Sequence, residues 1–359
     1  MPIEKSTQSN KIKINTVSLI RPSLNQKFDI LNLIKVFKIE WSMHKLFPTC
    51  KIVLQAQNDF ANNLKSTDRV RVSYQTGLID DYYEKRDIIF KITNVKTDMV
   101  AQSIPVHVYD LDMVEEGYYD LAYGRYSKRY NDTKINILSD IFQNYGFTFN
   151  GNISDNNSYP FYMLNSKINK DIRYIRLLGD EPMFLYKKMN DDTIYARDID
   201  SLLAQTTVIN LKSDKSVGKN AQQMMRNVNN VVVHNFFNQS EDASGYKLYT
   251  VDENTKSFTT ANKYIQNDEL YDVNRIASMK LTESCGYKER YYLTKTISFD
   301  YPYANTSLNV GDAINFTLTQ SYDSSEKTNI SDKYIIFGLE ESINMENLTI
   351  NQNLMIFKK

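Results

Sequence analysis

The sequence lacks features that mark several classes of protein. It has only two cysteines, Cys50 and Cys285, and their wide separation predicts two buried thiols rather than a disulfide framework. It has no apolar run of about 18 residues, so no bilayer span is expected. Its first residues contain no apolar core of the signal-peptide type, which predicts a protein made and used without secretion. The 43 basic residues balance the 43 acidic ones, so the basic excess typical of nucleic-acid binders is missing.

Catalytic signatures are also missing. The three histidines, His44, His107 and His234, have no His, Cys or carboxylate neighbour at metal-ligand spacing, and no GxSxG, GxGxxG or P-loop motif is present. Acidic pairs occur in three polar, turn-like segments: 78–84, 113–120 and 190–200. Both members of each pair are expected to stay ionised, unlike the acid and base of a glycosidase. The sequence therefore predicts no enzyme, no cofactor and no metal site.

What the sequence does contain is strand pattern near both ends. Alternating apolar and polar residues predict antiparallel strands with one buried face. In the first third these are 11–18, 36–42, 50–55, 69–74, 87–95 and 104–111. Between two of them, 58–65 is predicted to form a short helix capped by Asn58 or Asp59.

The middle of the chain predicts a small mixed domain. Residues 132–151 combine a helix, capped by Asp132 or Thr133 and ended by Gly146, with a following strand. The apolar face of this helix is predicted to be Ile135, Leu138, Ile141, Phe142 and Tyr145. Residues 170–198 predict a further helix followed by a hairpin that turns at 190–192.

Strand pattern then returns. The predicted strands are 206–212, 228–237, 292–301, 312–319, 332–343 and 348–357. The intervening segment 238–285 is predicted to hold an exposed loop at 239–245 and a helix within 262–284.

Two segments far apart match without a gap: 64–75, "LKSTDRVRVSYQ", and 308–319, "LNVGDAINFTLT". Aligning Asp68 with Asp312 also aligns four pairs of apolar residues: Leu64 with Leu308, Val70 with Ile314, Val72 with Phe316, and Tyr74 with Leu318. Each aspartate is expected to accept backbone N–H groups in a turn just before a strand. An Ile-Ile-Phe tripeptide follows each segment, at 88–90 and at 335–337. The repetition predicts a β domain that was duplicated within the chain.

Four stretches carry a resemblance to a known family. The closing segment, 308–319 followed by 334–357, resembles the end of the central baseplate hub proteins of contractile-tailed phages, a family related to the hub part of type VI secretion spike proteins. Residues 50–74 resemble the matching part of their first tube-like domain, and 134–151 with 171–198 resemble their middle domain.

The resemblance implies a mainly β fold with an α+β insert. Two tube-like antiparallel β-barrel or sandwich domains of duplicated origin would flank a small α/β domain, with a helical excursion. The expected boundaries are 1–110 for the first tube-like domain, 111–205 for the middle domain, 206–237 with 286–359 for the second tube-like domain, and 238–285 for the insertion.

The resemblance also implies a structural role in the virion. The chain would form a homotrimer whose six similar domains join a six-fold tail tube protein to a separate trimeric spike protein in the tail baseplate, beside other baseplate or tape-measure proteins, with DNA only in transit. The strand edges at 69–74 and 313–319 would pair across subunits. The alternative is a tail protein that binds a host receptor or carbohydrate, although Trp41 is the only tryptophan available for an aromatic platform.

Overall fold

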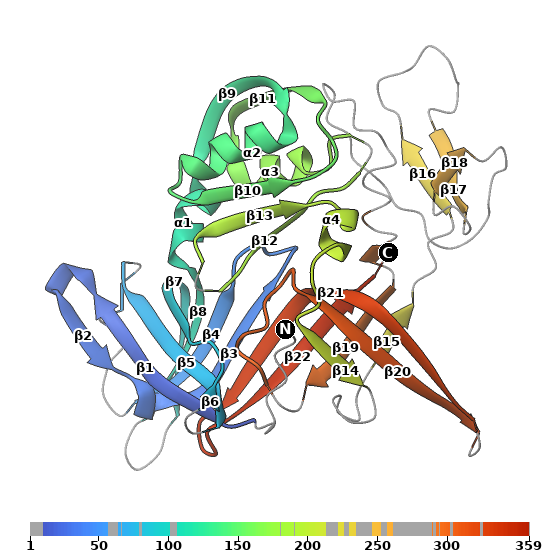
Figure 1. Cartoon of the computed structure of the whole chain (residues 1–359). Coiled ribbons are helices and arrows are strands. Elements are labelled where there is room, and N and C mark those ends of the chain that lie inside the picture. The colour runs from blue at the N-terminus through green and yellow to red at the C-terminus, as the bar shows by residue number, and fades with distance from the viewer. Residues whose placement is uncertain are drawn as a thin grey trace.

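The computed structural model contains one large β-sheet, a mixed α/β domain above its centre and a small separate sheet (Figure 1). It describes residues 10–358, apart from 57–63, 66, 79–80, 101–105, 180, 190, 213–221, 226–229, 235–245, 253–256, 261–288, 290–291, 294, 302–303 and 324–325. The fold is mainly β with an α+β insert, as predicted.

The first half of the large sheet, which we call the first β-unit, comes from the N-terminal part of the chain. Its strands are β1 (Ile12–Arg21), β3 (Ile34–Ser42), β4 (Thr49–Ala56), β5 (Arg69–Leu78), β7 (Arg86–Val100) and β8 (Val106–Glu115), with the short β2 (Gln26–Asp29) and β6 (Asp81–Tyr82) at the margins. They lie in the order β3-β4-β8-β7-β5-β1. Each of the six predicted N-terminal strands is therefore present.

The second half, the second β-unit, repeats this arrangement. Its strands are β14 (Ile209–Lys212), β15 (Gln222–Met225), β19 (Lys295–Tyr301), β20 (Ala313–Asp323), β21 (Glu326–Asn344) and β22 (Thr349–Phe357). They lie in the order β15-β19-β22-β21, with β20 beside β21 and β14 beside β20. Corresponding strands thus occur in the same order along the chain and across the sheet. One edge differs, because β14 runs parallel to β20 whereas β1 runs antiparallel to β5.

The first hairpins of the two β-units share one register. Val70 of β5 faces Phe90 of β7, and Ile314 of β20 faces Tyr334 of β21, so both members of the pair are displaced by 244 residues. The Ile-Ile-Phe tripeptides lie three positions out of step with this register and are not equivalent, which corrects the alignment made from the sequence. An odd shift would turn every side chain of the strand to the opposite face.

The second hairpins share a β-bulge at the same place. The ladder between β7 and β8 shifts just after Ile92, which faces Met113. The ladder between β21 and β22 shifts just after Ile336, which faces Ile356. Bulges bend a strand and raise its twist, so both long strands change direction at the same position.

The middle domain connects the two β-units. It contains α1 (Glu116–Tyr123), β9 (Arg125–Thr133), α2 (Lys134–Gln143), β10 (Thr148–Asn152), β11 (Ser158–Lys167), α3 (Ile168–Ile175), β12 (Phe184–Lys187), β13 (Thr193–Arg197) and α4 (Ile199–Leu203). Strands β12 and β13 form the predicted hairpin, and β10 pairs in parallel with β13. The domain has its own apolar core, separate from the core of the large sheet.

The predicted helix of the middle domain is confirmed in most details. Thr133 is its cap, because its Oγ1 accepts a hydrogen bond from Asn136 N at 3.2 Å. Gly146 ends the segment with φ at +81°. Its buried face differs slightly from the prediction, since Ile137 is buried whereas Ile135 and Tyr145 are only half-buried.

A three-stranded sheet lies apart from the large sheet and contains β16 (Asn230–His234), β17 (Tyr246–Asp252) and β18 (Ser257–Thr260) (Figure 1). The predicted assignment of 206–237 to the second tube-like domain is therefore wrong at β16, because β16 pairs with β17 instead of with the large sheet. The predicted loop at 239–245, the predicted helix within 262–284, Cys285 and most of the predicted helix at 58–65 lie outside the described residues.

Asp198 allows a test of how pH acts on the middle domain. Its carboxylate accepts hydrogen bonds from Ser201 N at 2.7 Å and Ser154 N at 2.8 Å. Burial alone would raise the pKa of Asp198, but these hydrogen bonds outweigh burial and hold the pKa below its usual value. The carboxylate therefore contributes stability above its unfolded pKa of about 3.9, and this contribution is lost as pH falls through the lower folded pKa.

We expect Asp198→Ala to lower the free energy of unfolding by about 0.5–2 kcal/mol at neutral pH, since it removes the cap of α4. Urea unfolding of the variant and the parent, compared from pH 7 downward, should show the difference shrinking below about pH 4. A difference that stays constant to pH 2 would contradict the assignment.

Candidate functional site

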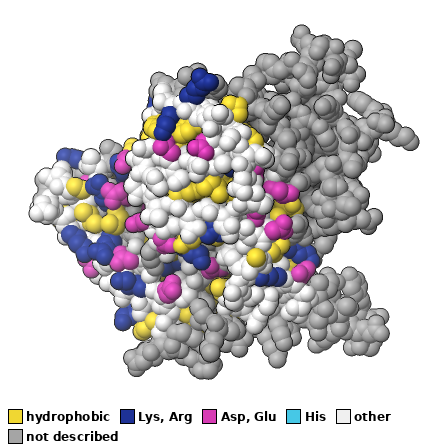
Figure 2. All heavy atoms as spheres, turned by 45° about the horizontal axis from the view of Figure 1, so that its top comes forward, with side chains coloured by type: hydrophobic (Ala, Val, Ile, Leu, Met, Phe, Trp, Pro, Cys, Tyr) yellow, Lys and Arg dark blue, Asp and Glu magenta, His cyan; other side chains and the backbone are white. Residues whose placement is uncertain are grey.

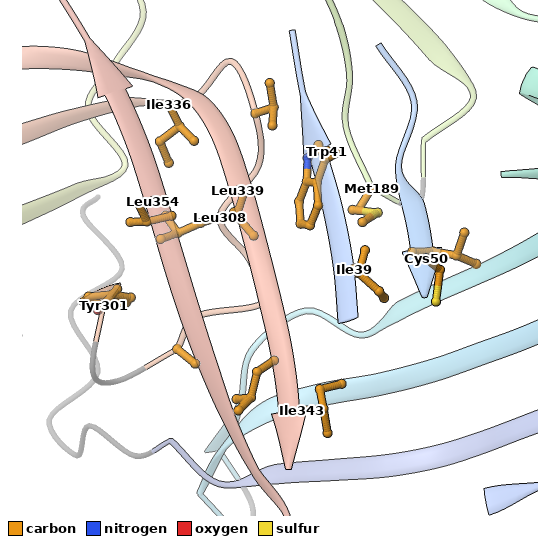
Figure 3. Packing of buried hydrophobic residues seen from close by; sticks show 14 of the residues in the cluster. Ile39, Trp41, Cys50, Met189, Tyr301, Leu308, Ile336, Leu339, Ile343 and Leu354 are labelled. Carbon is orange, nitrogen blue, oxygen red and sulfur yellow. The ribbon is translucent and has the colours of Figure 1, made fainter. Parts of the chain in front are cut away.

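Among the described residues, the main strand pairing between the two β-units joins β21 to β3 and forms the centre of the candidate site, and a single bridge between Lys11 and Thr349 adds to it. The part of β21 that follows its bulge leaves β20 and pairs antiparallel with β3, from Gly338 opposite Ser42 to Ile343 opposite Phe37. Figure 3 shows Ile39 and Trp41 of β3 lying beside Leu339 and Ile343 of β21. We call this contact the joint.

A buried polar network, the joint network, lies under this strand pair. The side chains of Arg86 and Glu341 are fully buried, and Arg86 Nη2 donates to Glu341 Oε1 at 3.0 Å and to Leu308 O at 2.9 Å. Gln352 Nε2 donates to the same Glu341 oxygen at 2.8 Å, and Tyr74 Oη donates to the other one. Each carboxylate oxygen thus has a donor, as a buried charge requires.

An aromatic side chain contacts each member of the charged pair. The guanidinium carbon of Arg86 lies 4.7 Å from the centre of the Trp41 ring, within the range of a cation–π contact. Burial raises the pKa of Tyr74, and the nearby charge of Glu341 acts in the same direction. The tyrosine therefore remains a hydrogen-bond donor over the physiological range.

A second set of contacts ties the end of β5 to the segment before β20. Thr76 N donates to Thr306 Oγ1 at 3.2 Å, and Thr306 N donates to Thr76 Oγ1 at 3.0 Å. Glu84 N donates to Ser307 Oγ at 3.0 Å. The residues involved lie more than 220 positions apart in sequence, so these contacts fix the orientation of one β-unit against the other.

The matched aspartates make the same local bonds. Asp68 Oδ2 accepts from Lys65 N at 2.9 Å, and Asp312 Oδ2 accepts from Asn309 N at 2.8 Å. The backbone N–H of Asp68 donates to the carbonyl oxygen of Lys65, and that of Asp312 donates to the carbonyl oxygen of Asn309. The carbonyl oxygen of each aspartate accepts a hydrogen bond from the long strand that follows, β7 for Asp68 and β21 for Asp312. The turn chemistry predicted from the sequence is confirmed at both places.

The outer partners of the two aspartates differ. Asp312 Oδ1 lies 2.9 Å from Lys188 Nζ of the middle domain, and burial raises the pKa of Asp312 although the lysine opposes this effect. Asp68 lies 3.5 Å from Arg21 Nε at the end of β1. The same turn thus contacts the middle domain in the second β-unit and the end of β1 in the first.

Two adjacent lysines hold the middle domain to both β-units. Lys188 reaches Asp312 in the second β-unit, while Lys187 Nζ lies 2.8 Å from Glu115 Oε1 at the end of β8 in the first. Consecutive residues of an extended chain point to opposite sides, which lets neighbouring lysines reach different partners. Burial raises the pKa of Glu115, and Lys187 opposes that shift.

The structure distributes the predicted site residues among these features. Buried side chains are those of Asp68, Val70, Val72, Tyr74, Leu308, Asp312, Ile314 and Phe316, while Leu64 is half-buried and Leu318 lies in β20. The predicted pairing of the 69–74 edge across subunits is wrong, because β5 has β1 on one side and β7 on the other. The edge of β20 is likewise occupied by β14 over Ile314–Thr317.

Sequence reasoning missed the joint network, although a signal existed. Glu341 stands between Leu339 and Ile343 in the inward phase of a strand, and Arg86 shares the inward phase of Ile88 and Phe90. A charge at an inward position of an alternating strand implies a buried partner. The sequence alone did not indicate that these two charges were each other's partner.

No catalytic arrangement is visible among the described residues. No group of three or more His, Cys, Asp and Glu side chains there could hold a metal ion. Asp191 accepts from Thr193 N at 2.8 Å in the hairpin turn, so this member of the acidic pair at 190–200 stabilises the turn. In the described part of the chain, no helix is both long and apolar enough to cross a membrane. Basic and acidic side chains are interspersed over the described part of the face in Figure 2.

Comparison with known proteins gives the fold. No protein-family model and no curated protein matches the sequence. The structure is similar to a tail protein from Neisseria meningitidis MC58, with a TM-score of 0.60, 8% identity and 96% of each chain covered. It is also similar to the 43 kDa tail protein of prophage MuSo2 from Shewanella oneidensis, with a TM-score of 0.59, 8% identity, and 96% of this chain and 98% of that one covered.

The chain has the fold of phage tail proteins. It also resembles a chain of the Francisella PdpA–VgrG complex, with a TM-score of 0.53 and 11% identity, over 98% of this chain and 53% of that one. The tail-protein fold therefore extends over both β-units and the middle domain.

Proposed function

We propose that this chain is a structural virion protein, the central hub of a phage tail baseplate, which acts as a homotrimer. One observation carries the proposal: the two β-units repeat the same strand order, turn, hairpin register and bulge. Three such chains supply six similar β-units, which suits a ring that meets a six-fold tail tube on one side and a three-fold spike on the other. A common origin of the two β-units belongs to the same proposal.

The way the β-units are held supports a mechanical role. The joint, its buried ion pair and the two lysine anchors fix both β-units and the middle domain to one another. A rigid chain that presents two ring segments at a set angle transmits symmetry without chemistry. The solved tail proteins share this fold over almost their whole length.

The proposed partners follow from that role. They are two further copies of the chain, the tail tube protein, a trimeric spike protein, and other baseplate or tape-measure proteins, with DNA passing only in transit. The proposed location is the tail baseplate of the virion, after assembly in the host cytoplasm. The formal net charge of zero is compatible with a channel that does not retain DNA.

The alternative role in receptor or carbohydrate binding has less support. An exposed tryptophan platform would favour it, but Trp41 is only 2% exposed and packs against Arg86. We therefore retain the hub as the proposed function.

Native mass spectrometry and light scattering of the purified protein test the proposal. We expect a species with three times the 41.9 kDa mass of one chain, and electron-microscopic class averages with six similar lobes around a central opening. A protein that remains monomeric at high concentration, or that forms a closed dimer, would refute the hub.

A further inference from the structure

The first β-unit has an open strand edge where the second β-unit has the joint. After its bulge, β7 pairs with β8 on one side, from Asn94 opposite Asp112 onward, and no described strand covers its other side. The corresponding stretch of β21 is covered by β3. Exposure agrees with this difference, since Lys96, Thr97 and Asp98 are exposed.

The corresponding positions of β21 are more protected. Leu339, Glu341 and Ile343 are all buried, and they alternate with less buried residues as in a half-covered strand. An uncovered strand edge presents unpaired N–H and C=O groups and invites pairing with another chain.

The second β-unit has the complementary open edge. Strand β15 lies at the end of the large sheet, and among the described strands it pairs with β19 alone. Its place corresponds to that of β3. Ile39 of β3 faces Cys50 of β4, and Gln223 of β15 faces Ile297 of β19. Cys50 and Ile297 are equivalent, because they occupy the same position in the pairing of β4 with β8 and of β19 with β22. Gln223 is therefore the equivalent of Ile39.

We propose that β7 of one copy pairs with β15 of the neighbouring copy in the register that β21 and β3 use within the chain. Transfer of that register places Val95 opposite Met225, Lys96 opposite Met224, Thr97 opposite Gln223, and Asp98 opposite Gln222 of the neighbouring copy. The inference rests on the ring proposed above and adds which edges close it.

The proposed contact is heterologous, because it uses two different edges of each copy. Such contacts close into a ring when the rotation between copies is right. In a trimer, three joints within chains would alternate with three contacts between chains, and all six would share one strand geometry.

The contacts between chains would lack the buried charges of the joint. In the register that the two β-units share, Thr97 of β7 is equivalent to Glu341 of β21, and Ile330 of β21 is equivalent to Arg86 of β7. A contact that forms after folding therefore avoids the desolvation cost of burying an ion pair. The charged network is confined to the joint that forms as the chain folds.

A cysteine pair across the proposed contact tests it. Met43 N donates to Phe337 O at 3.0 Å, so Phe337, Leu339 and Glu341 direct their backbone groups toward β3. Glu340 and Glu40 then form a pair without hydrogen bonds, the type with Cα atoms about 4.5 Å apart, which suits a disulfide. The equivalent pair between chains is Lys96 with Met224.

The experiment uses the full chain with Cys285→Ser and carries Lys96→Cys together with Met224→Cys. Mild oxidation should produce covalent dimers and trimers on a non-reducing gel, and thiol reduction should abolish them. Controls are the two single cysteine variants and an off-register pair, Thr97→Cys with Met224→Cys, whose side chains would lie on opposite faces of the sheet. We expect at least a tenfold greater covalent yield from the matched pair than from any control.

The outcomes separate this inference from the proposed function. A trimer by native mass that cross-links no better in the matched pair than in the controls overturns the strand pairing and leaves the hub in place. A protein that is monomeric by mass and does not cross-link overturns both.

Discussion

Glu341→Gln is expected to lower the free energy of unfolding by about 3–5 kcal/mol, because it leaves the charge of Arg86 buried without its counter-ion. Arg86 has no solvent exposure through which to recover hydration. The only tryptophan of the chain, Trp41, lies against Arg86. Urea unfolding followed by tryptophan fluorescence therefore reports directly on the joint.

The adjacent residue provides a matched control. Glu340 lies on the same strand and pairs with Lys38 at 3.0 Å, but its side chain is 41% exposed. An exposed ion pair contributes about 0–1 kcal/mol, so Glu340→Gln should scarcely shift the urea midpoint.

A double variant separates the buried charge from other effects of the substitution. Arg86→Met in the Glu341→Gln background removes both charges and should recover part of the lost stability, since a buried ion pair can be replaced by apolar side chains of similar volume. Equal midpoints for Glu341→Gln and Glu340→Gln would show that the ion pair does not hold the joint.

Gly311→Ala is expected to cost about 2–5 kcal/mol, the sum of a backbone and a packing penalty. Gly311 has φ at +90°, which side chains rarely adopt, and an added Cβ would lie 2.2 Å from Cε2 of Tyr186. Tyr186 belongs to β12 of the middle domain. The substitution should therefore lower the unfolding midpoint and also loosen the middle domain from the second β-unit, which limited proteolysis can detect.

Gly146→Ala is the control for the backbone penalty alone. Gly146 has φ at +81°, but an added Cβ there would meet no atom within 4 Å. We expect a cost of about 1–2 kcal/mol from the left-handed conformation. If both substitutions cost the same, the close approach of Tyr186 would have no energetic importance.

Local pattern was sufficient to predict most of the secondary structure. Strands such as β4 and β22 were found because each alternates buried and exposed residues over its length. The helix at 134–143 was found from its cap and its terminal glycine, which act within one turn of the chain. The turns at Asp68 and Asp312 were found for the same reason, since each aspartate bonds a residue three positions away.

The hydrophobic pattern of the sequence predicted the register and the pairing of the strands less well. The Ile-Ile-Phe tripeptides misled the alignment because any apolar strand uses the same few residues, whereas the register is set by hydrogen bonds across the whole hairpin. The segment at 228–237 has strand pattern in either sheet, so only the pairing of β16 with β17 could assign it.

The sequence by itself determined where strands, turns and the main helix form, and that one turn-and-strand element occurs twice. Only the tertiary structure decided which edges are covered, and that Arg86 meets Glu341 across 255 residues of chain. The physical reason is the distance along the chain over which each effect acts. Alternation in strands and capping of helices depend on residues that are near neighbours in sequence. Partners across a joint depend on how two sheets meet, and that depends on the packing of the whole chain.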